Sequence, residues 1–181
     1  IVGITGIYQI KISGSIIEDM PKSADFFKDI LFFDNSFNGI VPLEIWVDSK
    51  RKKGIIKPAT LNRMNRLHKT IEEIPELAPP LSVVNAVKYA KQAYYNGNPN
   101  YYALPTSQEN SFIYPYLNKS NNNSQLLDGY VDSTGQFGRI TTFMKDINTE
   151  RIEEIESNLN KKLKNLLFDL LDWIYLLIQM Y

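Results

Sequence analysis

The apolar residues of the chain show one arrangement twice: a strand-like run that ends in aspartate, then a turn, then an amphipathic helix. The first copy is residues 42–48 followed by a helix that begins near Pro58, and the second is residues 139–146 followed by a helix that begins near Thr149. In the first strand, aliphatic side chains alternate with polar or mixed ones, as in a strand with one buried face. The two βα units predict an internally duplicated α+β sandwich.

The helices of these two units carry the clearest helical signals. Proline suits the first turn of a helix, and Pro58 precedes apolar residues at spacings of three and four that end before Pro75. The second helix has Asn148 or Thr149 as its cap, glutamates in its first turns and lysines late, an order that the helix dipole favours. The predicted apolar faces are Leu61, Met64, Leu67, Ile71 and Ile74 in the first helix, and Ile152, Ile155, Leu159 and Leu163 in the second.

Shorter elements are predicted around these units. Residues 24–33 form a short helix whose aromatic face needs a partner surface. Residues 81–85 form a brief extended piece that passes into a helix over residues 86–95. Residues 126–132 and 138–146 are predicted to form a hairpin, because a short loop containing glycine separates them.

One domain is expected over residues 15–165, because a chain of 181 residues that is 44% hydrophobic is long enough for a substantial core. Within it, residues 97–124 are a surface excursion, partly helical around residues 109–117 and flexible by composition at its Asn-rich end. Residues 1–14 are predicted to be a membrane-proximal leader strand or the end of a membrane helix. Their apolar run is too short to cross a bilayer alone, because a span takes about 20 apolar residues. Residues 166–181 are predicted to be an apolar C-terminal helix that docks on the domain or lies in its core, because two aspartates interrupt the stretch. The alternative is a membrane-proximal helix.

Composition narrows the classes of function. Lysine plus arginine and aspartate plus glutamate are equal at 20 each, so no net charge favours nucleic acid or an anionic membrane surface. The sequence contains no cysteine, which excludes disulfides, thiolate zinc sites and cysteine nucleophiles. It contains neither a Gly-x-Gly-x-x-Gly nor a Walker-type run, the usual cradles for phosphate. We therefore expect no nucleic-acid partner, no cofactor and no metal site.

Candidate catalytic groups are few. His68, the only histidine, lies at the boundary of its helix, and no Ser-His-Asp set or histidine metal site can be assembled around it from the sequence. Pairs of carboxylates perform glycosidic chemistry, and Asp25, Asp29 and Asp34 form one candidate group. These acids alternate with aromatic residues that need burial, so a structural role is favoured. A small hydrolase that uses them is retained as a rival function.

Several short motifs follow one another in a recognisable order: Glu18-Asp19-Met20-Pro21, Phe26-Phe27, Phe37-Asn38-Gly39, Pro42-Leu43-Glu44-Ile45, the helix over residues 58–67, Pro79-Pro80-Leu81-Ser82-Val83-Val84-Asn85 and the late strand at Arg139-Ile140. In order and spacing, over residues 14–163, they resemble the periplasmic region of predicted exporters of the resistance-nodulation-division (RND) superfamily, the group that includes hydrophobe and lipid exporters. The chain differs from that pattern in two places. Asn38-Gly39 stands where a Gly-Gly pair is expected, and the residues after Leu163 do not match the strand and membrane helix that continue the pattern.

The resemblance implies a fold and a place in a larger protein. The segment would follow the first transmembrane helix of an inner-membrane protein and lie in the periplasm. The implied fold is a porter-type, ferredoxin-like βαβ-βαβ sandwich with a mainly antiparallel sheet and helices on one face. In such transporters the proton relay lies in membrane helices, so the resemblance implies no catalytic residue and no enzyme activity for this segment.

The resemblance also implies partners. Periplasmic domains of these exporters bind and pass apolar or amphiphilic molecules or lipids, and they contact the membrane portion of the same transporter and other subunits. We expect a substrate groove between the two βα units, because aromatic faces offer large contact areas to such ligands, and the candidate lining is Trp46, Phe143, Tyr101, Tyr102, Tyr114 and Tyr116. The alternative is a free-standing secreted module that binds glycans or lipids through an exposed patch over residues 101–116.

Overall fold

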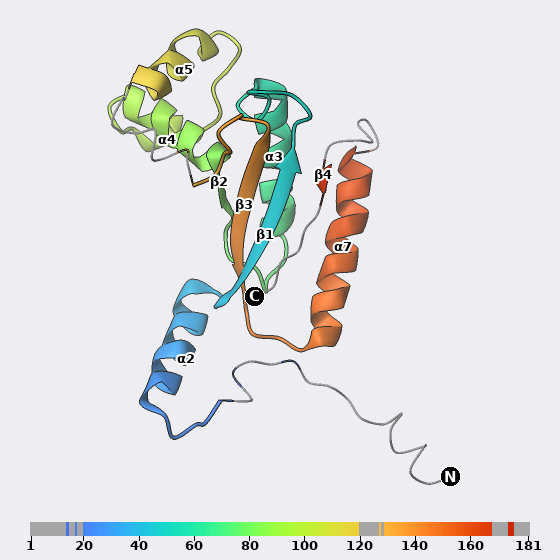
Figure 1. Ribbon diagram of the computed structural model, residues 1–181. Helices are drawn as coiled ribbons and strands as arrows, with labels where there is room; N and C mark the ends of the chain where they lie inside the picture. The colour runs from blue at the N-terminus through green and yellow to red at the C-terminus, as the bar shows by residue number, and fades with distance from the viewer. Residues whose placement is uncertain are drawn as a thin grey trace.

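An antiparallel sheet with the strand order β2-β3-β1-β4 organises this computed structural model, which describes residues 14, 17, 20–119, 127, 129–167 and 174–175 (Figure 1). The central strands β1 (Val41–Asp48) and β3 (Phe137–Met144) pair along their whole length. The short strand β2 (Leu81–Ser82) pairs with β3, and β4 (Ile174–Tyr175) pairs with β1, both in the antiparallel sense. The fold is therefore α+β, as the sequence predicts.

Each central strand is followed by a long helix, which confirms the two predicted βα units. β1 leads to α3 (Pro58–Glu72), which has proline in its first turn, and β3 leads to α7 (Thr149–Leu167). The residues of α3 spaced three and four apart are buried, as their periodicity predicts. In β1, buried and half-buried side chains alternate over most of the strand, so one face of the sheet belongs to a core.

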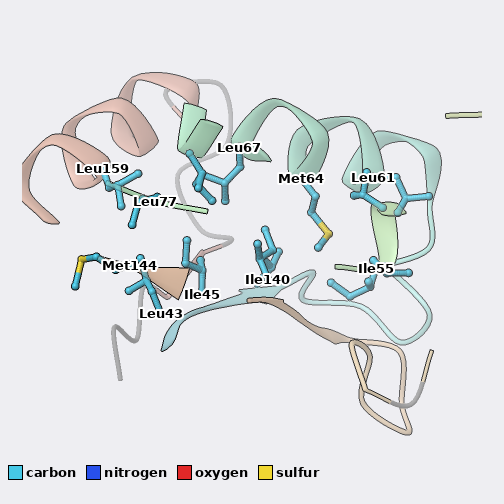
Figure 2. Packing of buried hydrophobic residues seen from close by; sticks show 14 of the residues in the cluster. Leu43, Ile45, Ile55, Leu61, Met64, Leu67, Leu77, Ile140, Met144 and Leu159 are labelled. Carbon is cyan, nitrogen blue, oxygen red and sulfur yellow. The ribbon is translucent and has the colours of Figure 1, made fainter. Parts of the chain in front are cut away.

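The core lies between this face of the sheet and the helices α3 and α7 (Figure 2). Figure 2 shows Ile45 of β1 and Ile140 of β3 directed toward Met64 and Leu67 of α3, with Leu159 of α7 at one end of the cluster. Burying one such aliphatic side chain fully is worth about 2 kcal/mol. This packing therefore fixes which face of the sheet the two helices cover.

The segment between β2 and β3 adds α4 (Val83–Tyr94), the 3-10 turn η1 (Pro99–Tyr101) and α5 (Asn110–Lys119), and α5 confirms the helix expected near residues 109–117. α4 begins earlier than expected because Ser82 caps it. The Ser82 hydroxyl accepts the N–H of Val84, and the Asn85 side chain accepts the N–H of Ser82. The β-branched pair Val83-Val84, which suggested an extended piece, is instead buried in the first turn of α4.

Other predicted segments are reduced or lie outside the described residues. In the described part of the chain, the predicted hairpin is only a bridge between Val131 and Gly138, because β3 pairs mainly with β1 and β2. Residues 1–13 and most of the expected helix over residues 166–181 lie outside the described residues, and Ile174–Tyr175 within it form β4. None of the described helices is long and apolar enough to cross a membrane.

α2 (Asp25–Phe37) precedes β1 and is attached to the domain through its C-terminal end. Asn38 ends the helix at a φ of 62°, and its side chain donates hydrogen bonds to the carbonyls of Pro75 and Leu77 at 3.3 and 2.9 Å. Gly39 follows with a φ of 139° and is buried against the main chain of Met144. Glycine takes such a conformation without strain, so the junction between α2 and β1 depends on Gly39.

Replacing Gly39 by alanine is expected to destabilise the protein by more than about 2 kcal/mol, because the added Cβ collides with the main-chain carbonyl of Met144 and strains φ. Gly97→Ala is the matched control, since Gly97 also has a positive φ, 76°, but an added Cβ there meets nothing within 4 Å. We expect the control to lose about 1 kcal/mol. Urea denaturation measures both losses, and equal values would contradict the close approach of Gly39 to Met144.

Candidate functional site

The face of the sheet opposite the core is the candidate substrate surface, here called the open face. The pleat and register of the central strands place on it Pro42, Glu44, Trp46, Phe137, Arg139, Thr141 and Phe143. Leu81 of β2 lies opposite Thr141 and belongs to the same face. Leu81 is 46% exposed and Phe143 41%, whereas Trp46 is half-buried. Apolar side chains of the open face are thus available to a ligand.

An ion pair lies within the open face. The Nη1 of Arg139 is 3.0 Å from Oε1 of Glu44, and its Nε and Nη2 donate to the carbonyl of Gly129 at 3.1 and 2.8 Å. These bonds fix the orientation of the planar guanidinium. Trp46 lies opposite Arg139, and Phe143 lies opposite Pro42, four residues before Trp46. The positions of Trp46 and Phe143 are therefore about 13 Å apart along the strands. The ion pair of Glu44 and Arg139 therefore lies beside Trp46 and separates it from Phe143.

Two of the tyrosines expected in the groove lie against α4. Tyr101 stacks on Tyr95 with ring centroids 4.0 Å apart. The Tyr102 hydroxyl accepts a hydrogen bond from Nδ2 of Asn85 at 3.3 Å. Both tyrosines follow the end of α4 in the chain, so their contacts return to that helix and not to the sheet.

Tyr114 lies beside the first turn of α3. With Pro58 and Leu61 it lines a shallow pocket with an internal volume of about 10 Å³, room for no more than a water molecule. The side chain of Tyr116 lies outside the described residues. The structure thus brings Trp46 and Phe143 to one face, but it does not bring Tyr101, Tyr102 or Tyr114 to that face, because α4 and α5 pack at the helix layer.

Sequence reasoning placed Glu44 on the same side of its strand as Trp46 without naming it as a site residue, and it missed Arg139 and Leu81 as members of the open face. The alternation that gave Trp46 its side of β1 gives Glu44 the same side. Arg139 could not be assigned in the same way, because its position depends on the register between two strands that lie 95 residues apart at this ion pair. Leu81 requires the pairing of β2, which is only two residues long.

Asp48 ends β1, whereas Asp146 lies two residues beyond the end of β3, and both aspartates stabilise adjoining loops. Asp48 is buried and accepts hydrogen bonds from the N–H of Lys50 at 2.7 Å and from Nε2 of Gln136 at 3.0 Å. Burial alone raises the pKa of Asp48, but the bonds from Lys50 and Gln136 outweigh it, and the pKa is lowered. Asp146 accepts the N–H of Ile17 at 2.6 Å. Both carboxylates therefore have structural partners.

The acids considered for hydrolysis lie on α2. Oδ1 of Asp34 accepts the N–H of Asp146 at 3.4 Å, whereas Asp25 and Asp29 are exposed. Over residues 20–119 and the other described positions, no three His, Cys, Asp or Glu side chains are grouped closely enough to hold a metal ion.

A charge cluster holds the start of α5 against α4. Glu109 accepts hydrogen bonds from Nζ of Lys91 at 2.8 Å, from the N–H of Thr106 at 2.8 Å and from the hydroxyl of Tyr95 at 3.1 Å. The bond from Lys91 is the main reason why the pKa of Glu109 falls to about 2. This part of the surface excursion is therefore firmly packed.

His68 joins α3 to the start of α4. Its Nε2 lies 2.8 Å from Oγ of Ser82, and its side chain is 2% exposed, so the expectation of a boundary histidine is wrong. Burial, with a smaller contribution from the charge of Lys88, lowers the pKa of His68 to about 4. The Ser82 hydroxyl is also buried, which closes this pair to a substrate.

We expect the free energy of unfolding to fall as the pH is lowered from about 6.5 to about 4. The folded chain keeps His68 neutral while the unfolded chain takes up a proton near its ordinary pKa, so acid favours unfolding. Neutral His68 therefore contributes about 3 kcal/mol to the free energy of unfolding. This contribution is complete above the pKa of histidine in the unfolded chain, about 6.5, and is lost as the pH falls to the pKa in the folded chain, about 4. Urea midpoints across this window measure it. His68→Leu should flatten the profile, and an unchanged slope in that variant would assign the titration to other groups.

Comparison of the sequence with models of known protein families and with curated proteins gives no match. The function is therefore inferred from the strand order, the open face and the motifs of the sequence.

Proposed function

We propose that this chain is the periplasmic domain of an inner-membrane RND-superfamily exporter and takes part in binding and passing apolar or amphiphilic molecules, lipids among them. The observation that carries the proposal is the strand order β2-β3-β1-β4. With the chain order β1-α3-β2 and β3-α7-β4, and with antiparallel pairing between all neighbours, it supports the ferredoxin-like βαβ-βαβ topology that we propose for the chain. α4 and α5 are then an insertion between the two units. This is the topology that the motif resemblance implies for a porter domain.

The two departures from the family pattern are compatible with the proposal. Asn38 has a φ of 62°, a left-handed conformation that asparagine tolerates and glycine takes freely, so Asn38-Gly39 can serve where a Gly-Gly pair is expected. Ile174 and Tyr175 pair with β1 after α7, where the pattern continues with a strand.

The open face suits an amphiphilic ligand. β1 and β3 belong to different βα units, so their shared open face is the position at which the groove was expected. Trp46 and Phe143 offer apolar area toward the two ends of this face, and the ion pair of Glu44 and Arg139 offers charge between them. A molecule with both an apolar body and a polar group can contact all of these side chains.

On this proposal the chain is not an enzyme by itself and needs no cofactor. Its partners are the transported molecule, the membrane portion of the same transporter and other subunits, without nucleic acid. A free-standing secreted module for glycans or lipids is the second candidate, favoured by the exposure of Tyr101 and Tyr102, which are 37% and 44% exposed.

Trp46→Ala is expected to weaken binding of an uncharged naphthylamine fluorophore to the full chain by about 5- to 10-fold, because an aromatic contact of about 1 kcal/mol or more is lost. Far-ultraviolet circular dichroism should not change, since Trp46 points away from the core. Tyr102→Ala is the matched aromatic control, and fluorescence titration measures both. Weakening by the Tyr102 change alone would favour the secreted module, and no weakening by either would exclude the open face as the binding surface.

The reading frame that encodes this segment tests its place in a transporter. We expect an apolar stretch of about 20 residues shortly before Ile1 and several such stretches after Tyr181. Sequencing the gene on both sides provides the measurement. A cleavable signal sequence upstream and a stop codon soon after Tyr181 would contradict the exporter and leave the secreted module.

A further inference from the structure

α2 presents a row of exposed aromatic side chains. Phe26, Phe33 and Phe37 are 50%, 51% and 59% exposed, and α2 has no buried residue. With Ile30 they recur at positions i, i+4, i+7 and i+11, so they lie along one side of the helix. Phe32, which is 62% exposed, lies apart from them, about 130° around the helix from their centre. The rings of Phe33 and Phe37 stack with centroids 5.5 Å apart. This phenylalanine stripe, Phe26, Ile30, Phe33 and Phe37, has the spacing with which helices enter apolar grooves.

The stripe is held in a defined orientation. The side chain of Asn38 is bonded to the loop after α3, the carboxylate of Asp34 accepts the N–H of Asp146, and Gly39 packs against Met144. Figure 1 shows α2 beside the ends of β1 and β3, away from α3 and α7. Because the helix is already formed and anchored, α2 loses less conformational entropy when it binds a partner.

The charges beside the stripe are acidic. At about 100° per residue, Asp29 and Asp34 fall on its two sides, about 70° from its centre, and Lys28 falls on the opposite side of the helix. A second α2 packed against the stripe in either direction would bring acidic side chains together, and an anionic lipid surface would also be repelled. A surface with basic groups on both sides is complementary to this arrangement.

We propose that the phenylalanine stripe docks as a helix into an apolar groove of another protein, and that lysine or arginine residues border this groove on both sides. The stripe and the open face consist of different residues, so this inference is independent of the proposed exporter function.

Photo-crosslinking in the cells that naturally make the full-length protein tests the proposal. Benzoylphenylalanine replaces Phe33 in one variant and Lys28 in the control, which carries the probe on the opposite side of the same helix. We expect the Phe33 position alone to crosslink to one protein segment that is apolar and flanked by Lys or Arg. Adding Asp29→Lys should reduce the yield at least about fivefold, and replacing a flanking basic residue of the partner by Glu should restore it.

Other outcomes would overturn the proposal. These are crosslinks to a second copy of this chain or to lipid, equal yields from both positions, a partner segment without basic residues, and no crosslink at all. Because α2 has no buried residue, the variants should fold, and an unchanged thermal midpoint checks this. Fluorophore binding at the open face should be unaffected by Asp29→Lys, which separates this result from the test of the exporter.

Discussion

The pairing of β1 with β3 is the interaction on which the rest of the structure depends. It joins the two βα units, and because successive side chains point to opposite faces, one register sets both surfaces of the sheet. Ile45 and Ile140 go to the core, while Trp46 and Phe143 go to the open face. A slip by one residue would exchange the faces and expose the aliphatic side chains. Burial against α3 and α7 therefore enforces the register that also builds the open face.

Local contacts at both ends of β1 stabilise this register. At one end, Gly39 lies against the main chain of Met144, at a distance that a side chain would prevent. At the other end, the buried carboxylate of Asp48 binds Lys50 and Gln136, and so ties the loop after β1 to the turn before β3. The strand-terminal Asp48 is thus a structural element of the sheet. The lowered pKa of Asp48 follows from these bonds and does not indicate a catalytic acid.

Local signals predicted most of the secondary structure, and long-range contacts account for what they missed. Pro58 and the spacing of apolar residues were sufficient for α3, because helix caps and periodicity are encoded within a few residues. The burial of His68 depends on its packing beside Ser82, and the place of Arg139 depends on strand register, so neither follows from nearby residues. For the site, alternation predicted the side of Trp46. It gave no information on Tyr114, whose position depends on how α5 packs.

The two exposed apolar surfaces differ in a way that suits different contacts. On the open face, Glu44 and Arg139 interrupt the apolar area between Trp46 and Phe143, so a ligand meets two separate aromatic contacts with charges between them. Such a surface favours weak and reversible binding, since each part contributes little. On α2 the apolar side chains are contiguous along the helix and acidic groups lie beside them, which is the arrangement of a hydrophobic interface core with a polar rim. The first surface therefore suits weak contacts with small ligands, and the second has the arrangement of a protein interface.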